Sequence, residues 1–172
     1  MAELPQDTKA TSDGEFQLVV FSIGSEEFGV EIMKVQEIIR MTSITKIPQA
    51  PEYIRGIINL RGRIIVVINL NVVLGMASKE QDENTRIIVG SIGDTVMGFV
   101  VDSVSEVIRL PEKSVEPAPS VIADKIGTEY VMGVGKLDNR LLILLSLDKI
   151  LSAKELHSIQ SISADAAGEA AT

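Results

Sequence analysis

Residues 54–70 read IRGIINLRGRIIVVINL, two apolar runs separated by the polar pair Arg61-Gly62. Both runs contain many of the β-branched residues that fit a pleated, half-buried surface. A short Arg-Gly break between such runs is typical of a β-hairpin, because glycine adopts the positive φ that a tight turn requires. The stretch therefore predicts two adjacent strands joined by a turn at residues 61–62.

The same pattern returns 77 residues further along the chain, where residues 131–147 read VMGVGKLDNRLLILLSL. Here Asp138-Asn139 stands in the place of Arg61-Gly62. Asparagine tolerates the left-handed backbone that glycine adopts, so the second segment predicts the same kind of turn. Upstream, SIG at residues 22–24 recurs at residues 91–93, an offset of 69 residues, and a short insertion around residues 121–128 accounts for the change in offset.

Resemblance between β-rich segments can arise from valine and isoleucine alone. Here the matches also include arginine, glutamate, tyrosine, proline and glycine, in the same order. The sequence therefore predicts a tandem duplication, with units at about 16–75 and 86–151 and a polar linker at 76–85. Each unit of about 60 residues would be only marginally stable alone.

Short strands at this spacing predict a mainly β protein with a five-stranded barrel in each unit. Packing of the two units would supply a shared core and leave a groove at their junction. Residues 32–39 suit a helix or a strand, and we expect a helical turn at Met33–Val35 followed by a strand. After Ser146, a candidate N-cap, apolar residues at helical spacing predict one amphipathic helix over Leu147–Ile162.

The ends of the chain have the composition of disordered segments. Residues 1–15 are expected to form a disordered N-terminal tail. Residues 158–172 are expected to hold the end of the helix and a second tail rich in alanine, serine and glycine. The domain proper is therefore predicted at residues 16–157.

The composition excludes several classes of function. The 172 residues include no cysteine and one histidine, His157, which excludes disulfides, thiolate nucleophiles and cysteine-based zinc sites. No motif unites a nucleophile with a base, and His157 is interpreted as a solvated surface residue, so we expect no catalysis, no cofactor and no metal. The net charge of −8 argues against nucleic acid. No apolar run approaches the roughly 20 residues that span a bilayer, so we expect a cytoplasmic protein without direct membrane insertion.

The two hairpin tips differ in a way that turn geometry does not require. Arg61 at the first tip is free to serve recognition, because arginine suits docking to carboxylates, and a solvated arginine is the alternative. Glu37 and Glu106 form a second pair of candidates, each placed between apolar neighbours. A structural role, such as pairing with Arg40 or Arg109, and a role in binding stay equally open.

Several segments carry a resemblance to a known family, chiefly residues 28–38 (FGVEIMKVQEI), 51–62 (PEYIRGIINLRG) and 130–137 (YVMGVGKL). They resemble the CheW-like family of bacterial chemotaxis coupling proteins, over residues 17 to 156. The resemblance implies two SH3-like five-stranded β-barrels with a hydrophobic core between them. In that family the first strand can pair with the second barrel, so sequence repeats need not equal spatial subdomains.

The resemblance also implies the partners. CheW-like proteins are adaptors that bind the regulatory domain of the histidine kinase CheA, which has the same fold, and the cytoplasmic tip of methyl-accepting chemoreceptors. The groove between the barrels would receive an apolar receptor helix. The resemblance carries over four partner-binding residues, without division between kinase and receptor: Val35, Glu37, Gly56 and Arg61. We extend this set by inference to Ile32, Asn59, Leu60, Gly62, Val100 and Val104.

These expectations describe a non-catalytic, cytoplasmic scaffold recruited to membrane-associated receptor arrays. Two other readings of the sequence stay open at this point. The first is a coupler of the same type that serves a kinase pathway other than motility. The second is a small ligand-binding β-barrel, for which a deep polar pocket would be the sign.

Overall fold

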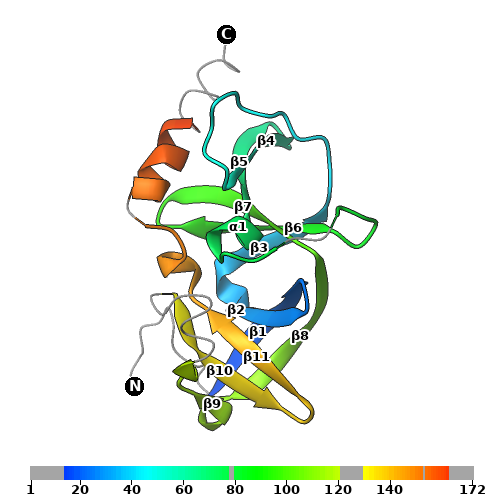
Figure 1. Ribbon diagram of the computed structural model, residues 1–172, viewed down its shortest axis with the longest axis vertical. Coiled ribbons are helices and arrows are strands. Elements are labelled where there is room, and N and C mark those ends of the chain that lie inside the picture. The colour runs from blue at the N-terminus through cyan, green and yellow to red at the C-terminus, as the bar shows by residue number, and fades with distance from the viewer. Residues whose placement is uncertain (1–13, 78–79, 121–129, 153, 163–172) are drawn as a thin grey trace.

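The computed structural model describes residues 14–77, 80–120, 130–152 and 154–162, and it consists of two curved β-sheets stacked along the long axis of the molecule (Figure 1). The sheet with strand order β8-β1-β2-β11-β10-β9 is the lower barrel, and the sheet with order β3-β6-β7-β5-β4 is the upper barrel. This architecture confirms the predicted mainly β fold of two SH3-like subdomains. The strands are β1 (Glu15–Ile23), β2 (Glu26–Glu31), β3 (Val35–Arg40), β4 (Ile54–Leu60), β5 (Arg63–Asn69), β6 (Arg86–Ile92), β7 (Thr95–Val101), β8 (Ser103–Pro111), β9 (Val115–Glu116), β10 (Val131–Leu137) and β11 (Arg140–Leu145).

Each sequence repeat contributes strands to both barrels. The first hairpin of the first repeat, β1–β2, lies in the lower barrel between β8 and β11 of the second repeat. Conversely, β6–β7 of the second repeat lies in the upper barrel between β3 and β5 of the first. The two repeats are therefore intertwined, and neither barrel is built from one repeat alone. The predicted units at 16–75 and 86–151 describe the duplication and not the barrels.

The hairpins that complete the two barrels are equivalent in detail. The Asn69 N–H, at the end of β5, donates a hydrogen bond of 2.7 Å to the carbonyl of Tyr53. At the equivalent place after β11, the Ser146 N–H donates a hydrogen bond of 2.9 Å to the carbonyl of Tyr130. Because both the donor and the acceptor are offset by 77 residues, the duplication read from the sequence is also a duplication of backbone geometry.

A β-bulge interrupts both of these hairpins at a glycine. The strand register shifts next to Gly56 and next to Gly133, whose φ values are 151° and 158°. A Cβ on Gly133 would lie 2.7 Å from the carbonyl oxygen of Glu116, and one on Gly56 would collide with the carbonyl of Thr45. The neighbouring backbone can approach this closely only because neither glycine carries a side chain.

Alternate residues of the central strands face two different cores. In β5, Ile65 and Val67 point into the upper barrel, whereas Val66 and Ile68 point into a larger core shared by the two barrels. Burial on both faces explains why the sequence shows continuous apolar runs there and not a simple alternation. The shared core holds the largest fully buried side chains of the described residues, Phe21, Phe28 and Phe99.

The C-terminal helix begins later than predicted. Residues after Ser146 form the 3-10 turn η3 (Leu147–Lys149), and a separate helix covers 154–162. Ser146 makes no capping hydrogen bond with its side chain. Instead, Ser152 and Glu155 accept each other's backbone N–H groups at 3.1 and 2.8 Å, a capping box that sets the start of the helix.

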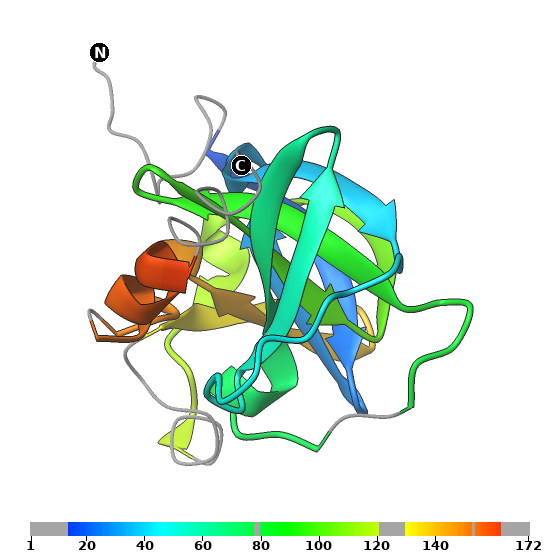
Figure 2. The same ribbon diagram turned by 90° about the horizontal axis from the view of Figure 1, so that it is seen from above.

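This helix packs against one side of the upper barrel when the molecule is seen from above (Figure 2). Its Ile159 is fully buried in the shared core, whereas His157 is exposed, as predicted. No helix within the described residues has the length and apolar character to cross a membrane. Of the predicted tails at 1–15 and 158–172, residues 1–13 and 163–172 lie outside the described residues, as does the insertion at 121–128; β1 already begins at Glu15, and residues 158–162 form the end of the helix.

Candidate partner-binding surface

The turn at residues 61–62 is built as the sequence predicts. Arg61 and Gly62 both have positive φ, 54° and 87°, which is the backbone of a tight two-residue hairpin. The Gly62 N–H donates a hydrogen bond of 2.8 Å to Oδ1 of Asn59, while Leu60 packs half-buried against the core of the upper barrel. Among the predicted site residues of this hairpin, Gly56, Asn59, Leu60 and Gly62 shape it, and Arg61 projects from it.

The equivalent tip at residues 138–139 has a different backbone. Among the described non-glycine residues, positive φ occurs at Gln49 and Arg61, and therefore at neither Asp138 nor Asn139. The prediction that Asn139 would repeat the left-handed backbone of the first tip is wrong. The two tips thus differ in shape as well as in charge.

Arg61 is exposed at the tip but not free, because it forms a two-pronged ion pair with Glu37. Its two terminal nitrogens donate to the carboxylate oxygens at 2.6 and 2.8 Å, and its side chain keeps 71% of its surface exposed. These hydrogen bonds lower the pKa of Glu37 and raise the pKa of Arg61. The proposed pairing of Glu37 with Arg40 is therefore not the one that forms. Since β3 and β4 end the strand order of the upper sheet, the pair joins its two edges.

An ion pair at the lower barrel matches this one, but a different residue makes it. Arg140 donates to Glu106 on β8 and lies 2.9 Å from the carboxylate of Glu27 on β2, which raises the pKa of Arg140. Arg140 is the equivalent of Arg63, not of Arg61. The proposed partner of Glu106, Arg109, instead lies 3.9 Å from Glu15.

Between consecutive strands, the described chain crosses from one barrel to the other at two places, which define the seam. The first crossing is the 3-10 turn η1 (Ile32–Lys34) ahead of β3, one residue earlier than the predicted turn at Met33–Val35, and the second is Asp102, ahead of β8. Three of the predicted groove residues, Ile32, Val35 and Val104, pack half-buried against the shared core beside these crossings. Val100 does not join them, because it is buried in the core of the upper barrel.

Two further apolar residues extend this surface, and the sequence reasoning missed them. Ile38 on β3 and Val107 on β8 are 36% and 54% exposed. Their strand neighbours Ile39 and Ile108 pack toward the separate barrel cores, so alternation turns Ile38 and Val107 toward the seam. The two residues are 69 apart, and this repeat offset is the signal that could have identified them. We call this set the seam stripe: Ile32, Val35, Ile38, Val104 and Val107.

A β-bulge in each strand aligns the stripe. Val35 pairs with Gly90 and Glu37 with Val89, so Gln36 is the extra residue of β3. On β8, Val104 and Glu106 pair with consecutive residues of β1, so Ser105 is the extra residue. Each bulge brings side chains three residues apart onto one face of its strand. This explains why the apolar spacing in residues 32–39 also suited a helix.

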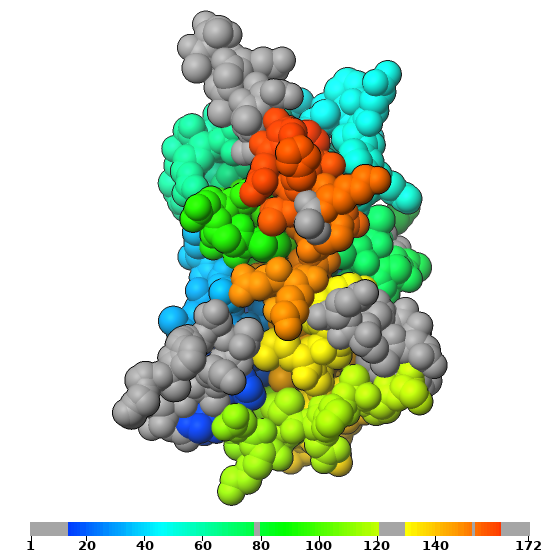
Figure 3. Space-filling model, turned by 90° about the vertical axis from the view of Figure 1, so that its left-hand side faces the viewer, coloured from blue at the N-terminus to red at the C-terminus, as the bar shows by residue number. Residues whose placement is uncertain are grey.

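On another side of the molecule, the chain itself covers the junction. The C-terminal segment, coloured orange to red, rises from the lower lobe along the upper lobe (Figure 3). Leu156 and Ile162 of its helix pack against the shared core. This side of the junction is therefore closed to a partner, whereas the side of the seam stripe is exposed.

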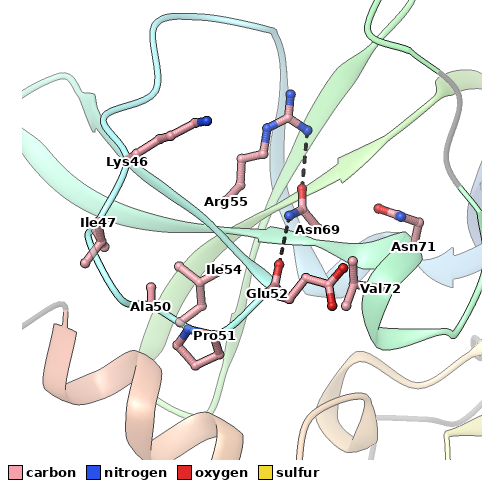
Figure 4. A pocket seen from close by; sticks show the side chains of 10 residues that line it. All are labelled: Lys46, Ile47, Ala50, Pro51, Glu52, Ile54, Arg55, Asn69, Asn71 and Val72. Carbon is pink, nitrogen blue, oxygen red and sulfur yellow. Dashed lines mark hydrogen bonds between the residues drawn. The ribbon is translucent and has the colours of Figure 1, made fainter.

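A cavity of about 490 Å³ lies beside β4 and β5 (Figure 4). Arg55 lines it and donates to Oδ1 of Asn69 at 3.3 Å and to Oε1 of Gln81 at 3.0 Å. None of its lining residues belongs to the core inside either barrel, so the cavity lies outside both barrels. Side chains fill the two barrel interiors. Within the described residues, no group of three or more acidic or histidine side chains could hold a metal ion.

Comparison with known proteins gives a consistent result. Residues 17–155 match the CheW-like domain family. The chain is 40% identical to the chemotaxis protein CheW of Klebsiella aerogenes over 85% of this chain and 87% of that one. It is 34% identical to the chemotaxis protein CheW of Treponema pallidum over 89% and 92% of the two chains. The crystal structure of the scaffolding protein TtCheW from Thermoanaerobacter tengcongensis aligns with a TM-score of 0.74 at 41% identity, covering 81% of this chain and 96% of that chain.

Proposed function

We propose that this chain, which belongs to the CheW-like domain family, is a non-catalytic adaptor that couples methyl-accepting chemoreceptors to a CheA-type histidine kinase. Relatives named chemotaxis protein CheW and a neighbour described as a scaffolding protein support this role. The adaptor acts in the cytoplasm at receptor arrays, and it works by holding partners together and not by a reaction. A coupler that serves a kinase pathway other than motility would use the same surfaces.

The observation that carries this proposal is the seam stripe. Ile38 and Val107 are exposed at equivalent positions of the two repeats, and each pairs across its strand with a residue of the shared core, Ile88 and Val19. An apolar strip between two rigid lobes fits one face of an amphipathic helix, which buries residues spaced by one turn. We assign this surface to the helical tip of the receptor.

The upper hairpin tip offers a contact of a different kind. The bidentate pair with Glu37 fixes the direction of the Arg61 guanidinium while most of that side chain stays exposed. A charged group that is already ordered loses little entropy when a partner docks on it. We assign Arg61 to recognition of the kinase or the receptor. A ligand-binding barrel is the weaker candidate, since side chains fill both barrel interiors.

The test is the binding of the purified full chain to a receptor cytoplasmic fragment. Replacing Val107 or Ile38 with aspartate places a charge in the seam stripe, and we expect about a tenfold loss of receptor affinity. The matched control is Asn139→Asp, which adds the same charge at the exposed lower tip and should leave affinity unchanged. Equal affinity of all three variants and the wild type would remove the seam stripe from the proposal.

A further inference from the structure

Met33 is the most exposed large apolar side chain of the described residues, with 88% of its surface accessible. It is the middle residue of η1, the turn that carries the chain from the lower barrel to the upper barrel. Its neighbours Ile32 and Val35 pack half-buried against the shared core. Met33 therefore projects from the seam stripe, where the proposed function places the receptor helix.

The fold holds this turn in place on several sides. The Val35 N–H closes it by donating to the carbonyl of Ile32, and Nζ of Lys34 lies 2.9 Å from a carboxylate oxygen of Asp148. The Lys34 carbonyl sits so close to Gly90 that a Cβ there would be 2.6 Å away. Because its flanking residues are fixed, the exposure of Met33 is a property of the fold and not of a loose loop.

The chemistry of this side chain differs from that of its apolar neighbours. The chain has six methionines and no cysteine, so thioethers are its only sulfur groups. Met97 is fully buried, whereas Met41, Met76 and Met132 are half-buried against the three core clusters. Reactivity toward two-electron oxidants follows the exposure of the sulfur, which singles out Met33 among these residues.

We propose that Met33 is an oxidation-controlled contact of the receptor-binding surface, which hydrogen peroxide converts to methionine sulfoxide. The sulfur lone pair attacks one peroxide oxygen, and the O–O bond breaks as the S–O bond forms. The departing hydroxide then takes the proton from the transferred oxygen and leaves as water. The sulfur is oxidised by two electrons and the peroxide is reduced. The sulfoxide then places a strong hydrogen-bond acceptor in an apolar surface, where a docked helix would bury it without a donor.

The first part of the test measures where oxidation occurs. The full chain is exposed to limiting hydrogen peroxide, digested and analysed by mass spectrometry. Met33 should gain one oxygen about tenfold faster than Met41, Met76, Met97 or Met132, in keeping with their burial. Faster oxidation of any of these four would overturn the inference.

The second part measures the affinity of a receptor cytoplasmic fragment before and after this treatment. Oxidation should weaken binding about tenfold, and methionine sulfoxide reductases should restore it. Met33→Leu keeps the apolar contact but cannot form a sulfoxide, so its affinity should not respond to peroxide. Met33→Gln should reproduce the loss without an oxidant. An equal loss in Met33→Leu, or no loss in the oxidised wild type, would overturn the inference.

The inference rests on the proposed function, and the two can fail separately. If the untreated chain binds neither the receptor fragment nor the kinase regulatory domain, the proposed function is wrong. If the untreated chain binds the receptor and conversion of Met33 leaves the affinity unchanged, only the oxidation control is wrong. Thermal unfolding of Met33→Leu and Met33→Gln should match the wild type, because the side chain is exposed.

Discussion

The upper and lower barrels repeat the same arrangement of strands, but they differ in which arginine pairs with the glutamate of the edge strand, β3 or β8. In the upper barrel, Arg61 at the hairpin tip reaches Glu37 on β3. In the lower barrel, Arg140 at the start of β11 reaches Glu106 on β8. The glutamates are equivalent positions of the duplication, whereas the arginines are not.

This difference separates what the fold requires, an arginine paired with the glutamate, from what it does not require, an arginine on the hairpin tip. Both barrels bring an arginine to the same glutamate position, but the lower barrel does so from the first residue of β11 and leaves its tip to Asp138-Asn139. The upper barrel places the cation on the tip itself, in a turn that needs positive φ at both residues. Because the lower barrel forms its pair without such a tip, the fold does not require an arginine there, which supports the proposed contact of Arg61 with a partner.

The strongest effect should come where the two barrels are most alike, at their bulge glycines. In Gly56→Ala or Gly133→Ala the new Cβ meets a backbone carbonyl that cannot move aside, in a conformation that side chains rarely adopt. We expect each change to lower the free energy of unfolding by about 3 kcal/mol. Urea denaturation measures this, and a cost below about 1 kcal/mol in one barrel would show that the bulges are not equivalent.

A smaller effect should appear where the barrels differ. Arg61→Glu removes the cation from the tip, and we expect about a tenfold loss in assembly of the ternary complex with receptor and kinase. The double variant Arg61→Glu/Glu37→Arg restores an ion pair with reversed charges, so the ion pair should form again while assembly stays reduced. Pull-down with purified components measures the assembly of both variants.

Arg140→Glu is the matched control in the lower barrel. It breaks the equivalent pair with Glu106 at a site away from the upper tip, so assembly should stay close to wild type. If Arg140→Glu weakens assembly as much as Arg61→Glu does, both ion pairs affect assembly only by stabilising the fold, and Arg61 is not a direct contact.

The smallest effect is a change in titration. The hydrogen bonds from Arg61 lower the pKa of Glu37 below its ordinary value of 4.5. A carboxylate with a lowered pKa contributes its stabilisation above the ordinary value, and this contribution is lost as the pH falls through the lowered pKa. NMR titration of Arg61→Ala should therefore show the pKa of Glu37 returning toward 4.5. Identical titration in the wild type and the variant would mean that the pair does not form in solution.

The sequence predicted the duplication and the hairpins because turn residues and apolar runs are local signals. The unequal tips are also visible without any contact information, and the role in recognition that they suggest for Arg61 stays a prediction. The ion pair with Glu37 was not predictable in the same way, because it links β3 and the tip after β4, which follow each other in the sequence but lie at opposite ends of the strand order. The start of the last helix was mistaken because Ser146 is a plausible cap, although Ser152 with Glu155 is the stronger local signal.

The seam stripe was half predicted, and the bulges explain why. A strand without a bulge would turn Val35 and Ile38 to opposite faces, and the extra residue at Gln36 turns them to the same face. In the sequence, the signal for these bulges is that the same apolar spacing recurs around Ser105, the bulge residue of β8 that is equivalent to Gln36. Val100 was assigned to the wrong side because nothing local shows which of two buried faces belongs to the seam.

The exchange of hairpins between the repeats also sets the order in which the chain can fold on the ribosome. The β1–β2 hairpin is made before the other strands, yet its partners β8 and β11 both lie in the second repeat. A ribosome adds about 5–20 residues per second, so the first hairpin waits several seconds with its apolar residues unpaired. The upper barrel has all its strands once β7 emerges, whereas the lower barrel cannot close until β11 is released. Synthesis therefore completes the barrel with the arginine tip before the barrel that contains the chain's own beginning.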